Sequence, residues 1–408
     1  MSSTQHWKKI KLKYLADMRS GESITSDVIE PTGLYPVYGG GALRGYTSEY
    51  THEGKYVLIG RQGAHCGNVK TVQGKFWASE HAVVVTPSSI VDIDWLGYLL
   101  ESMNLNQYSM SAAQPGLAVS MIKNLEVLCP AKNIQEKITK YINTKVTSIE
   151  ELIKQKEKLI QLIEEKRQSM ITEVVTKGLN PNVKMKDSGV EWVGEIPFNY
   201  KTMKLKHLVE TKITDGPHET PVLCEEGVPF ISAEAIKSGK VDFNYMRGFI
   251  SVEDHKKFSK KCFPKYGDIF MVKSGATTGK IGIVDTNEEF SIWSPLALIR
   301  ANKEKILNGF LYYYMQSDIF QKQVQLGWNY GTQQNIGMGV IENLLIICPP
   351  VDIQNILLEK IESESKNIDT LKEELNIQIQ KLKDYRQSLI YGGVTGKIDV
   401  RDFEIESE

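Results

Sequence analysis

The sequence has few of the residues that metal sites and disulfides need. Its 408 residues include five cysteines, an odd number, and seven histidines scattered along the chain. No two cysteines have the C-x-x-C spacing of zinc or redox motifs. Cys129 and Cys348 stand in apolar runs, which predicts buried thiols in a reducing compartment.

Long apolar runs are also missing. No stretch approaches the roughly 18 apolar residues that indicate a membrane-spanning helix. The N-terminal residues carry Lys8, Lys9, Lys11 and Lys13 without the apolar core of a signal peptide. With 41% hydrophobic and 24% charged residues, the composition is typical of globular domains. These features predict a cytoplasmic protein with no membrane partner.

An excess of charge of one sign is missing as well. The chain has 49 basic and 50 acidic side chains, which give a net charge of -1. This balance provides no global attraction to nucleic acid, so any nucleic-acid surface must arise from local segregation of charge.

Catalytic and nucleotide-binding motifs are absent from the sequence. It has neither an Asn/Asp-Pro-Pro-aromatic run for methylation of a base amino group nor an H-E-x-x-H metal motif. Residues 275–280 resemble a phosphate loop, but only three residues separate the glycines and Ile281 follows the lysine. We therefore expect no catalytic residues, no metal and no bound cofactor in this chain.

The main positive feature is an internal duplication. Residues 124–130, Asn-Leu-Glu-Val-Leu-Cys-Pro, reappear at 343–349 as Asn-Leu-Leu-Ile-Ile-Cys-Pro. The register then continues without a gap, since Gln135 falls on Gln354 and Arg167 on Arg386. A repeat this long is a duplicated domain with its helix and not a solenoid unit. It predicts two similar surfaces, related by a pseudo-twofold axis or a translation.

Each half begins with a globular part of mixed secondary structure. Short apolar runs bounded by Gly, Pro and Asn predict strands at 56–59, 82–85, 268–272 and 296–299. Short helices are predicted at 95–102 and 308–317. The mixture indicates an α+β fold rather than a regular alternation of strand and helix.

Each half ends in a long amphipathic helix with a coiled-coil type seam. The seam residues are Ile142, Val146, Ile149, Ile153, Ile160, Ile163, Met170 and Val174, then Ile361, Ile368, Leu375, Ile379, Leu382 and Leu389. The polar residues that interrupt the seam are Lys156, Arg167, Ser365, Lys372 and Arg386. Gly178 and Gly392-Gly393 are the predicted stops.

The two seams are best buried against each other. At about 40 residues and about 1.5 Å per residue, each helix would extend for about 60 Å. We therefore expect the two helices to pair as an antiparallel coiled coil. The alternative is that both are ordinary core elements.

The predicted domain boundaries follow the repeat. The first globular domain is expected at 1–130 and the first long helix at 131–180. A polar, turn-rich linker at 181–200 leads to the second globular domain at 201–350. The second long helix and a C-terminal segment occupy 351–400.

Gly-containing turns occupy equivalent places in the two globular parts. Residues 61–68 align with 273–280, and residues 114–117 align with 333–336 in polar turns expected just before a strand. The frame is retained while the polar residues differ, as a protein that reads two different targets requires. Tight turns without ligand contact are the alternative, as is an exposed linker for the glycines 39–41 before Arg44.

The polar residues of these loops are the candidate DNA-binding residues. Asn and Gln pair with adenine, and Arg or Lys with guanine, in the major groove. Lysines at 256–265 alternate with Phe258, Phe263 and Tyr266, which suits a phosphate backbone, with a solvated lysine face as the alternative. The candidates are Arg44, Arg61, Gln62, His65, Asn68, Gln114, Lys256, Lys257, Lys260, Lys273, Ser274, Thr277, Thr278, Lys280, Gln333, Gln334 and Asn335.

Together these features resemble the specificity subunit of type I restriction–modification systems. The resemblance rests on two variable globular parts that are each followed by a similar long helix. It extends to the helix endings at 165–169 and 384–388, to residues 189–197 and to Val-Thr-Gly-Lys-Ile at 394–398. Residues 175–179, Val-Thr-Lys-Gly-Leu, depart slightly from that last segment. The resemblance covers nearly the whole chain.

The resemblance implies a non-catalytic subunit with two target-recognition domains. Each domain would read one half of a split, asymmetric site in double-stranded DNA. The helix pair would hold the domains apart and dock two modification subunits, which use S-adenosylmethionine to methylate adenine. Restriction subunits of the same assembly would use ATP and Mg²⁺. The competing hypothesis is a coiled-coil scaffold whose globular parts bind protein ligands.

Overall fold

The computed structural model describes residues 6–39, 42–109, 116–330, 334–401 and 403. The chain forms two compact units, each with its own core. Unit 1 comprises residues 1–157 and 375–408, and unit 2 comprises residues 158–374. Two long helices, α3 (Lys132–Lys177) and α8 (Val351–Val394), each contribute one stretch to both units. None of the helices in the described residues is long and apolar enough to cross a membrane.

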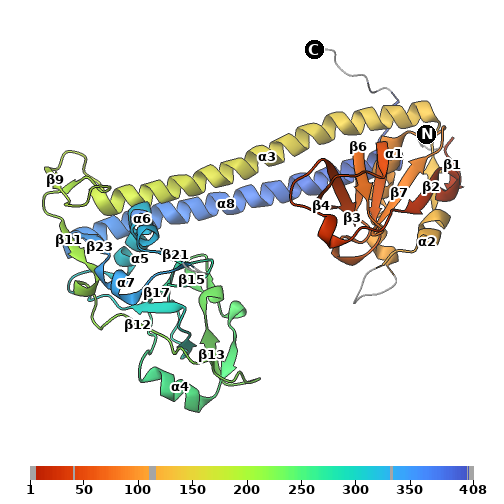
Figure 1. The fold of residues 1–408 in the computed structure, drawn as a ribbon. Helices are drawn as coiled ribbons and strands as arrows, with labels where there is room; N and C mark the ends of the chain where they lie inside the picture. Colours follow the sequence, from red (N-terminus) through yellow and green to blue (C-terminus); the bar gives the residue numbers. More distant parts are fainter. Residues whose placement is uncertain (1–5, 40–41, 110–115, 331–333, 402, 404–408) are drawn as a thin grey trace. The chain divides into compact units, whose positions relative to one another are not determined.

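Unit 1 contains a six-stranded sheet in the order β2-β7-β5-β6-β3-β4. Figure 1 labels its strands β2, β3, β4, β6 and β7. Its strands are β2 (Ala16–Ser20), β3 (Tyr35–Gly39), β4 (Ala42–Thr47), β5 (His52–Gly60), β6 (Val69–Ala78) and β7 (Ala82–Pro87). Helix α1 (Ile93–Ser102) packs Trp95 and Leu96 against Val57 and Val85 of the sheet. A two-stranded sheet, β1 (Lys8–Lys11) with β8 (Glu126–Cys129), and the helix α2 (Val119–Asn124) complete the globular part.

Unit 2 repeats this plan with shorter strands and an added layer. Its six-stranded sheet has the order β12-β20-β17-β18-β15-β14, and a three-stranded sheet has the order β16-β13-β19. The strands are β12 (Thr214–Asp215), β13 (Val228–Ile231), β14 (Ile236–Lys237), β15 (Lys240–Val241), β16 (Gly248–Ile250), β17 (Ile269–Val272), β18 (Ile281–Ile283), β19 (Ser291–Ile292) and β20 (Leu296–Ile299). The helices are α4 (Val252–Ser259), α5 (Asn308–Gln316), α6 (Asp318–Leu326) and α7 (Met338–Asn343).

The remaining strands of unit 2 form three two-stranded sheets. They are β9 (Met185–Asp187) with β10 (Glu195–Pro197), β11 (Lys201–Lys204) with β23 (Leu345–Cys348), and β21 (Asn329–Tyr330) with β22 (Gln334–Asn335). The strands and short helices predicted from the sequence are all present, with bounds that differ by up to four residues.

Equivalent residues make equivalent contacts in the two units. Lys8 pairs with Cys129 in the β1–β8 sheet, and Lys201 pairs with Cys348 in the β11–β23 sheet. The strand that enters each globular part is therefore held by the strand that leaves it. The duplication predicted from the sequence thus extends to strand register.

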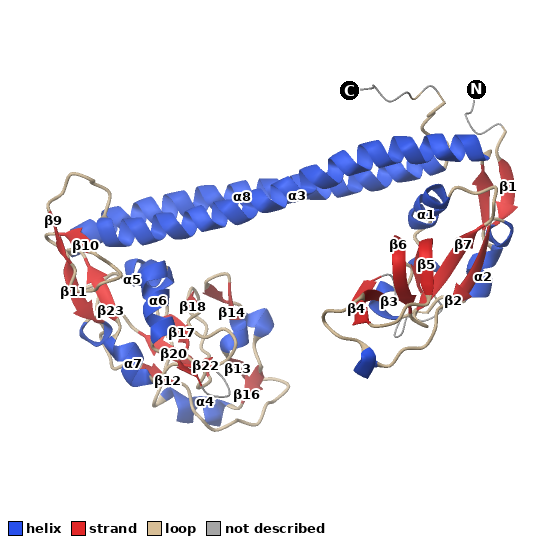
Figure 2. Cartoon of the chain, turned by 45° about the horizontal axis from the view of Figure 1, so that its top comes forward, coloured by secondary structure: helices blue, strands red, loops and turns tan. Residues whose placement is uncertain are grey.

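The seam of each long helix is turned away from solvent. In unit 1 the seam residues Ile142, Val146 and Ile149 are buried. In unit 2 Ile163 of α3 and Ile361 of α8 are buried as well. Within each unit the two helices run side by side (Figure 2).

Four of the five polar residues that interrupt the seam, Lys156, Arg167, Lys372 and Arg386, connect one helix to the other through their side chains. In unit 1 Arg386 donates to Glu150 at 3.0 Å and Lys156 donates to Gln378 at 2.7 Å. In unit 2 Lys372 donates to Glu164 at 2.5 Å, and Arg167 forms an ion pair with Asp369. The two arginine contacts are the same contact in the repeat, because Arg167 corresponds to Arg386 and Glu150 to Asp369. These polar side chains therefore form hydrogen bonds and ion pairs between the two helices at the positions where the apolar seam is interrupted.

Glycine ends one long helix as predicted but not the other. Gly178 follows the last residue of α3 with φ = +72°, the left-handed conformation that favours glycine at a helix end. The predicted stop at Gly392-Gly393 is wrong, because α8 continues to Val394. A Cβ on Gly393 would lie 3.0 Å from Ile142 Cδ1, so this glycine allows close packing of α8 against α3 within unit 1.

A buried glutamine anchors the start of each long helix. Gln135 is 1% exposed, and its amide donates to the Pro130 carbonyl and accepts from the Asp92 N–H at 2.8 Å. Gln354 is 0% exposed and does the same with the Pro349 carbonyl and the Leu307 N–H. Each amide thus joins its long helix to the segment that precedes the neighbouring short helix.

Replacing Gln354 with alanine is expected to lower the stability of unit 2 by about 2–4 kcal/mol. The change leaves the half-buried Leu307 N–H without its partner, which costs about 1–3 kcal/mol, and removes the amide donor from the Lys305 and Pro349 carbonyls, which keep a weak contact to the Cys348 thiol. Urea unfolding of the full chain measures the effect. The control is Gln325→Ala at an exposed position, for which a change within about 0.5 kcal/mol is expected. Equal effects of the two variants would contradict the anchoring role.

Candidate nucleic-acid interface

In unit 1 the Gly turn at 61–68 meets the segment that precedes α2. Gln62 forms a bridge with Gly116, and the Leu117 N–H donates to the Arg61 carbonyl at 2.9 Å. Gly63 and Gly67 both have positive φ. A Cβ on Gly67 would lie 2.3 Å from the Asn106 backbone nitrogen, so the turn is packed closely against its surroundings.

In unit 2 the equivalent residues meet in the same way. Ser274 forms a bridge with Asn335, and the Ile336 N–H donates to the Lys273 carbonyl at 2.8 Å. Gly275 and Gly279 again have positive φ. We call this arrangement the cradle: residues 61–68 with 116–117 in unit 1, and residues 273–280 with 334–336 in unit 2. In each unit, two segments that are far apart in the sequence are thus joined backbone to backbone.

Two of the candidate DNA-binding residues stand just before the cradle segments in the sequence. Gln114 and Gln333 lie outside the residues that the structure describes. Gln334 and Asn335 are exposed, but they form the short strand β22 instead of a turn. The element that follows them is the helix α7 and not a strand, so the prediction of turns just before a strand is wrong. The reason is that Gln334 and Asn335 are paired with the Gly275 turn and with β21.

The polar side chains of the unit 1 cradle face solvent. Gln62, His65 and Asn68 are exposed, and Asn68 Nδ2 lies 3.3 Å from His65 Nδ1. Arg61 is half-buried and donates to the Ser20 hydroxyl at 3.0 Å. Arg44 is exposed on β4, in the same unit. These residues present hydrogen-bond donors and acceptors, and the Arg61 guanidinium is held in place by Ser20. Such groups suit the reading of base edges.

The unit 2 cradle presents a different set of groups. Thr277 is exposed, and Lys280 is half-buried with no ion pair to any side chain that the structure describes. The Thr278 hydroxyl donates to the Gly275 carbonyl at 2.7 Å, so this side chain closes the turn. Ser274 is half-buried beside Asn335, which is exposed. The same backbone therefore carries different chemistry in the two units.

Lys273 is held by an acidic residue that the sequence analysis missed. Its ammonium lies 3.1 Å from Asp215, with 12% of the Lys273 side chain and 9% of the Asp215 side chain exposed. Lys261 donates to the other carboxylate oxygen of Asp215 at 2.5 Å. Burial acts to raise the pKa of Asp215, but the hydrogen bonds from Lys261 and Lys273 outweigh it, so this pKa lies below its ordinary value. The carboxylate is therefore charged near neutral pH.

The lysine run of unit 2 is partly exposed. Lys256, Lys257 and Lys260 are exposed at and just beyond the C-terminal end of α4, where Lys257 forms an ion pair with Glu219 at 2.5 Å. Phe258 is only 5% exposed because it packs in a small core with Phe230. Of the aromatic residues in the run, Tyr266 at 65% exposure is the most accessible. The lysines are thus available to phosphates, whereas Phe258 is a core residue.

Unit 2 also contains an Arg247–Trp293 cation–π pair, which no sequence pattern predicted. The guanidinium of Arg247 stacks over the Trp293 ring at 4.3 Å from its centroid. The two side chains line a hollow of about 110 Å³ together with the partly exposed Leu223. The residues come from separate segments, so only the fold brings them together.

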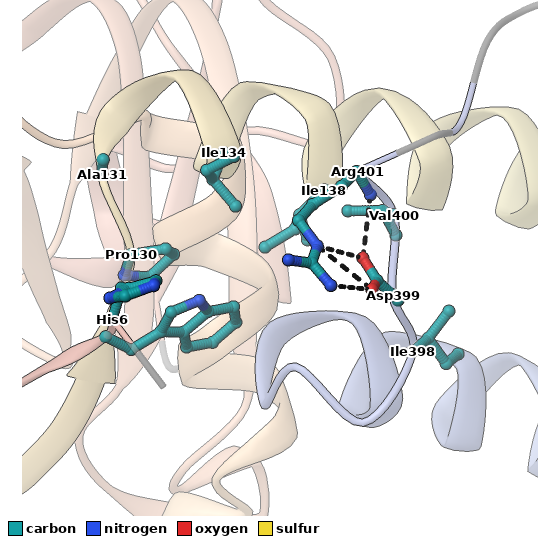
Figure 3. Close-up of a pocket in the computed structure, with 10 residues that line it drawn as sticks. His6, Pro130, Ala131, Ile134, Ile138, Ile398, Asp399, Val400 and Arg401 are labelled. Atoms are coloured by element: carbon teal, nitrogen blue, oxygen red, sulfur yellow. Dashed lines mark hydrogen bonds and ion pairs between the residues drawn. The ribbon is translucent and has the colours of Figure 1, made fainter. Parts of the chain in front are cut away.

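An apolar hollow of about 160 Å³ lies in unit 1 at the start of α3 (Figure 3). Ile134, Ile138 and Ile398 line it, and an Asp399–Arg401 ion pair stands at its edge. Its lining is mainly apolar, and the charged side chains at its edge, Asp399 and Arg401, are paired with each other. We therefore place the candidate interface at the cradles.

Comparison with known proteins identifies the family. A family model described as "Type I restriction modification DNA specificity domain" matches residues 4–162 and 197–381. The specificity subunit of the Escherichia coli type I restriction enzyme EcoprrI is 44% identical over 128 residues, which is 30% of this chain and 32% of that protein. The MjaVIII specificity subunit of Methanocaldococcus jannaschii is 25% identical over 315 residues, which is 75% of this chain and 71% of that protein.

A solved structure has a similar fold. It comes from work on complex assembly and conformational transition of the type I restriction–modification system, with a TM-score of 0.66 and 14% identity. The similarity covers 96% of this chain and 98% of that chain. The family predicted from sequence is confirmed, and both halves match one family model. The chain therefore belongs to the specificity subunits of type I restriction–modification systems, the non-catalytic subunits that supply DNA sequence recognition.

Proposed function

We propose that each cradle reads one half of a bipartite, asymmetric DNA site. The carrying observation is that the two units repeat the same backbone bridges, Gln62 with Gly116 and Ser274 with Asn335. The side chains on that shared frame differ. A common frame places the two sets of side chains alike on the duplex, and the differing side chains select different bases.

The long helices serve in this proposal as the element that sets the distance between half-sites. Their cross-helix contacts have falling residue numbers on α8 as the numbers rise on α3, in unit 1 and again in unit 2. This order supports an antiparallel coiled coil. Half-sites about one turn of DNA apart, roughly 34–36 Å, face the same side of the duplex.

The partners in this proposal supply all of the chemistry. Two modification subunits dock on the helices and methylate adenine with S-adenosylmethionine. Restriction subunits use ATP and Mg²⁺. The support is the family assignment.

Methylome sequencing of cells that carry this chain with its modification subunits tests the proposal. The expected result is one methylated consensus with two specific parts and an unspecified gap. A continuous consensus would contradict the reading of half-sites by separate cradles. The absence of any methylation or sequence enrichment would favour a scaffold that binds proteins.

A further inference from the structure

The residue that contacts the first cation of each cradle occupies the same place in the two units. Ser20 ends β2 opposite Val83, and Asp215 ends β12 opposite Ala297. In the central strands Ile59 pairs with Val83 and Met271 pairs with Ala297, so these strand positions correspond.

The glycine that follows is equivalent too. A Cβ on Gly21 would lie 2.2 Å from the Ala78 carbonyl oxygen, and a Cβ on Gly216 would lie 2.1 Å from that of Ile292. In both units the backbone therefore passes equally close to a neighbouring segment, directly after Ser20 in unit 1 and directly after Asp215 in unit 2. The two side chains start from matched backbone positions.

The charge at this matched position differs. In unit 1 the neutral Ser20 hydroxyl accepts from Arg61 at 3.0 Å, and no described carboxylate lies within ion-pair distance of Arg61. The charge of the Arg61 guanidinium is therefore not neutralised by a neighbouring carboxylate, and its other N–H groups can still donate to a ligand. In unit 2 Asp215 binds both Lys273 and Lys261, and the imidazole of His218 lies 3.3 Å away.

The consequence for DNA binding follows from electrostatics. A carboxylate between two ammonium groups competes with DNA phosphates for the same cations. It cancels charge that would otherwise attract any DNA sequence, because non-specific affinity comes from phosphate neutralisation. The carboxylate cancels one of the two ammonium charges, so the attraction of Lys273 and Lys261 for the DNA backbone is reduced.

We propose that the position occupied by Ser20 and Asp215 is a specificity-determining position that controls the cation at the root of each cradle. Asp215 withholds Lys261 and Lys273 from phosphates, so unit 2 discriminates through Thr277, Lys280 and Asn335. Ser20 orients Arg61 without neutralising it, so unit 1 reads with a guanidinium that is held in place but keeps its net charge. The proposal rests on the proposed function of the cradles.

Reciprocal exchange of the two residues tests the proposal. The full chain is prepared as wild type, Asp215→Ser and Ser20→Asp, and its binding to a random-sequence duplex is titrated by fluorescence anisotropy over a salt series. Asp215→Ser is expected to bind about 3- to 10-fold more tightly at about 50 mM salt, with a salt slope steeper by about 1 to 2. Ser20→Asp is expected to bind more weakly, with a shallower slope.

Further variants separate charge from folding. Asp215→Asn keeps the shape of the side chain and is expected to act in the same direction as Asp215→Ser. Adding Lys261→Ala to Asp215→Ser is expected to remove part of the gain. Thermal unfolding of each variant reports its fold. A folded Asp215→Asn with unchanged or weaker binding and an unchanged salt slope would overturn the proposal.

The outcome is distinguishable from failure of the proposed function. Selection of preferred sequences from random DNA with the wild-type chain tests that function alone. A wild type that selects a bipartite site while the exchanges leave salt slopes unchanged refutes only the role of Asp215. A wild type that selects no sequence refutes the proposed function, and this position then determines no specificity.

Discussion

Replacing Thr277 and Lys280 together with alanine is expected to relax recognition at one half-site and leave the other intact. Both residues belong to the unit 2 cradle, and neither is tied into the ion pair that holds Lys273. A good contact to a base edge contributes about 1–3 kcal/mol of discrimination, so a loss of about 10- to 100-fold is expected at the affected positions. Methylome sequencing of the assembled system gives the relaxed consensus directly.

Exposed lysines outside the cradle provide the matched control. Lys256→Ala with Lys260→Ala removes the same kind of charge from the end of α4. Such phosphate-type contacts are expected to weaken binding to all sequences equally and to lower the salt slope by about 2. If Thr277→Ala with Lys280→Ala instead weakened both half-sites to the same degree, these two residues would contact phosphates and not bases.

The long helices were the part of the fold most accessible to sequence reasoning. Their seams repeat at spacings of three and four over many turns, and a pattern that long has few competing explanations. The ends were harder to predict. Gly392-Gly393 has the composition of a stop, but a glycine also permits close helix packing, and only the position of Ile142 shows that packing decides here.

The cradles were predictable as loops but not as joined structures. The repeat aligned Arg61 with Lys273 and Gly116 with Asn335, and these residues lie in the segments that the structure joins by bridges. The bridges that join the segments connect residues far apart in the chain. No local pattern reports such pairing, so the short strand at Gln334-Asn335 was missed.

Asp215 shows why the chemistry of the site was harder to predict than its location. It lies in a short Thr-Asp-Gly-Pro stretch that has the composition of an ordinary turn. Its partners Lys261 and Lys273 reach it only through the sheet and the end of α4. Phe258 is the reverse case, since its place among lysines suggested a surface that binds the phosphate backbone, whereas its side chain is buried in a core.

Lengthening both long helices by one turn is expected to lengthen the unread gap of the DNA site. Four residues would be added to α3 after Glu157 and four to α8 after Glu374, the points where unit 1 and unit 2 divide. Paired additions leave the contacts of Arg386 with Glu150 in unit 1 and of Lys372 with Glu164 in unit 2 as they are. Four helical residues add about 6 Å, and successive base pairs are about 3.4 Å apart. The gap in the methylated consensus should therefore grow by one or two base pairs.

The two half-sites themselves should stay the same, because the added turns leave the cradles unchanged. The control is a four-residue insertion after Asn287, in an exposed loop of unit 2, which should leave both the gap and the half-sites as in wild type. An unchanged gap in the lengthened variant would show that α3 and α8 do not set the distance between half-sites. A changed half-site with an unchanged gap would instead mean that the helices support the cradles and have no measuring role.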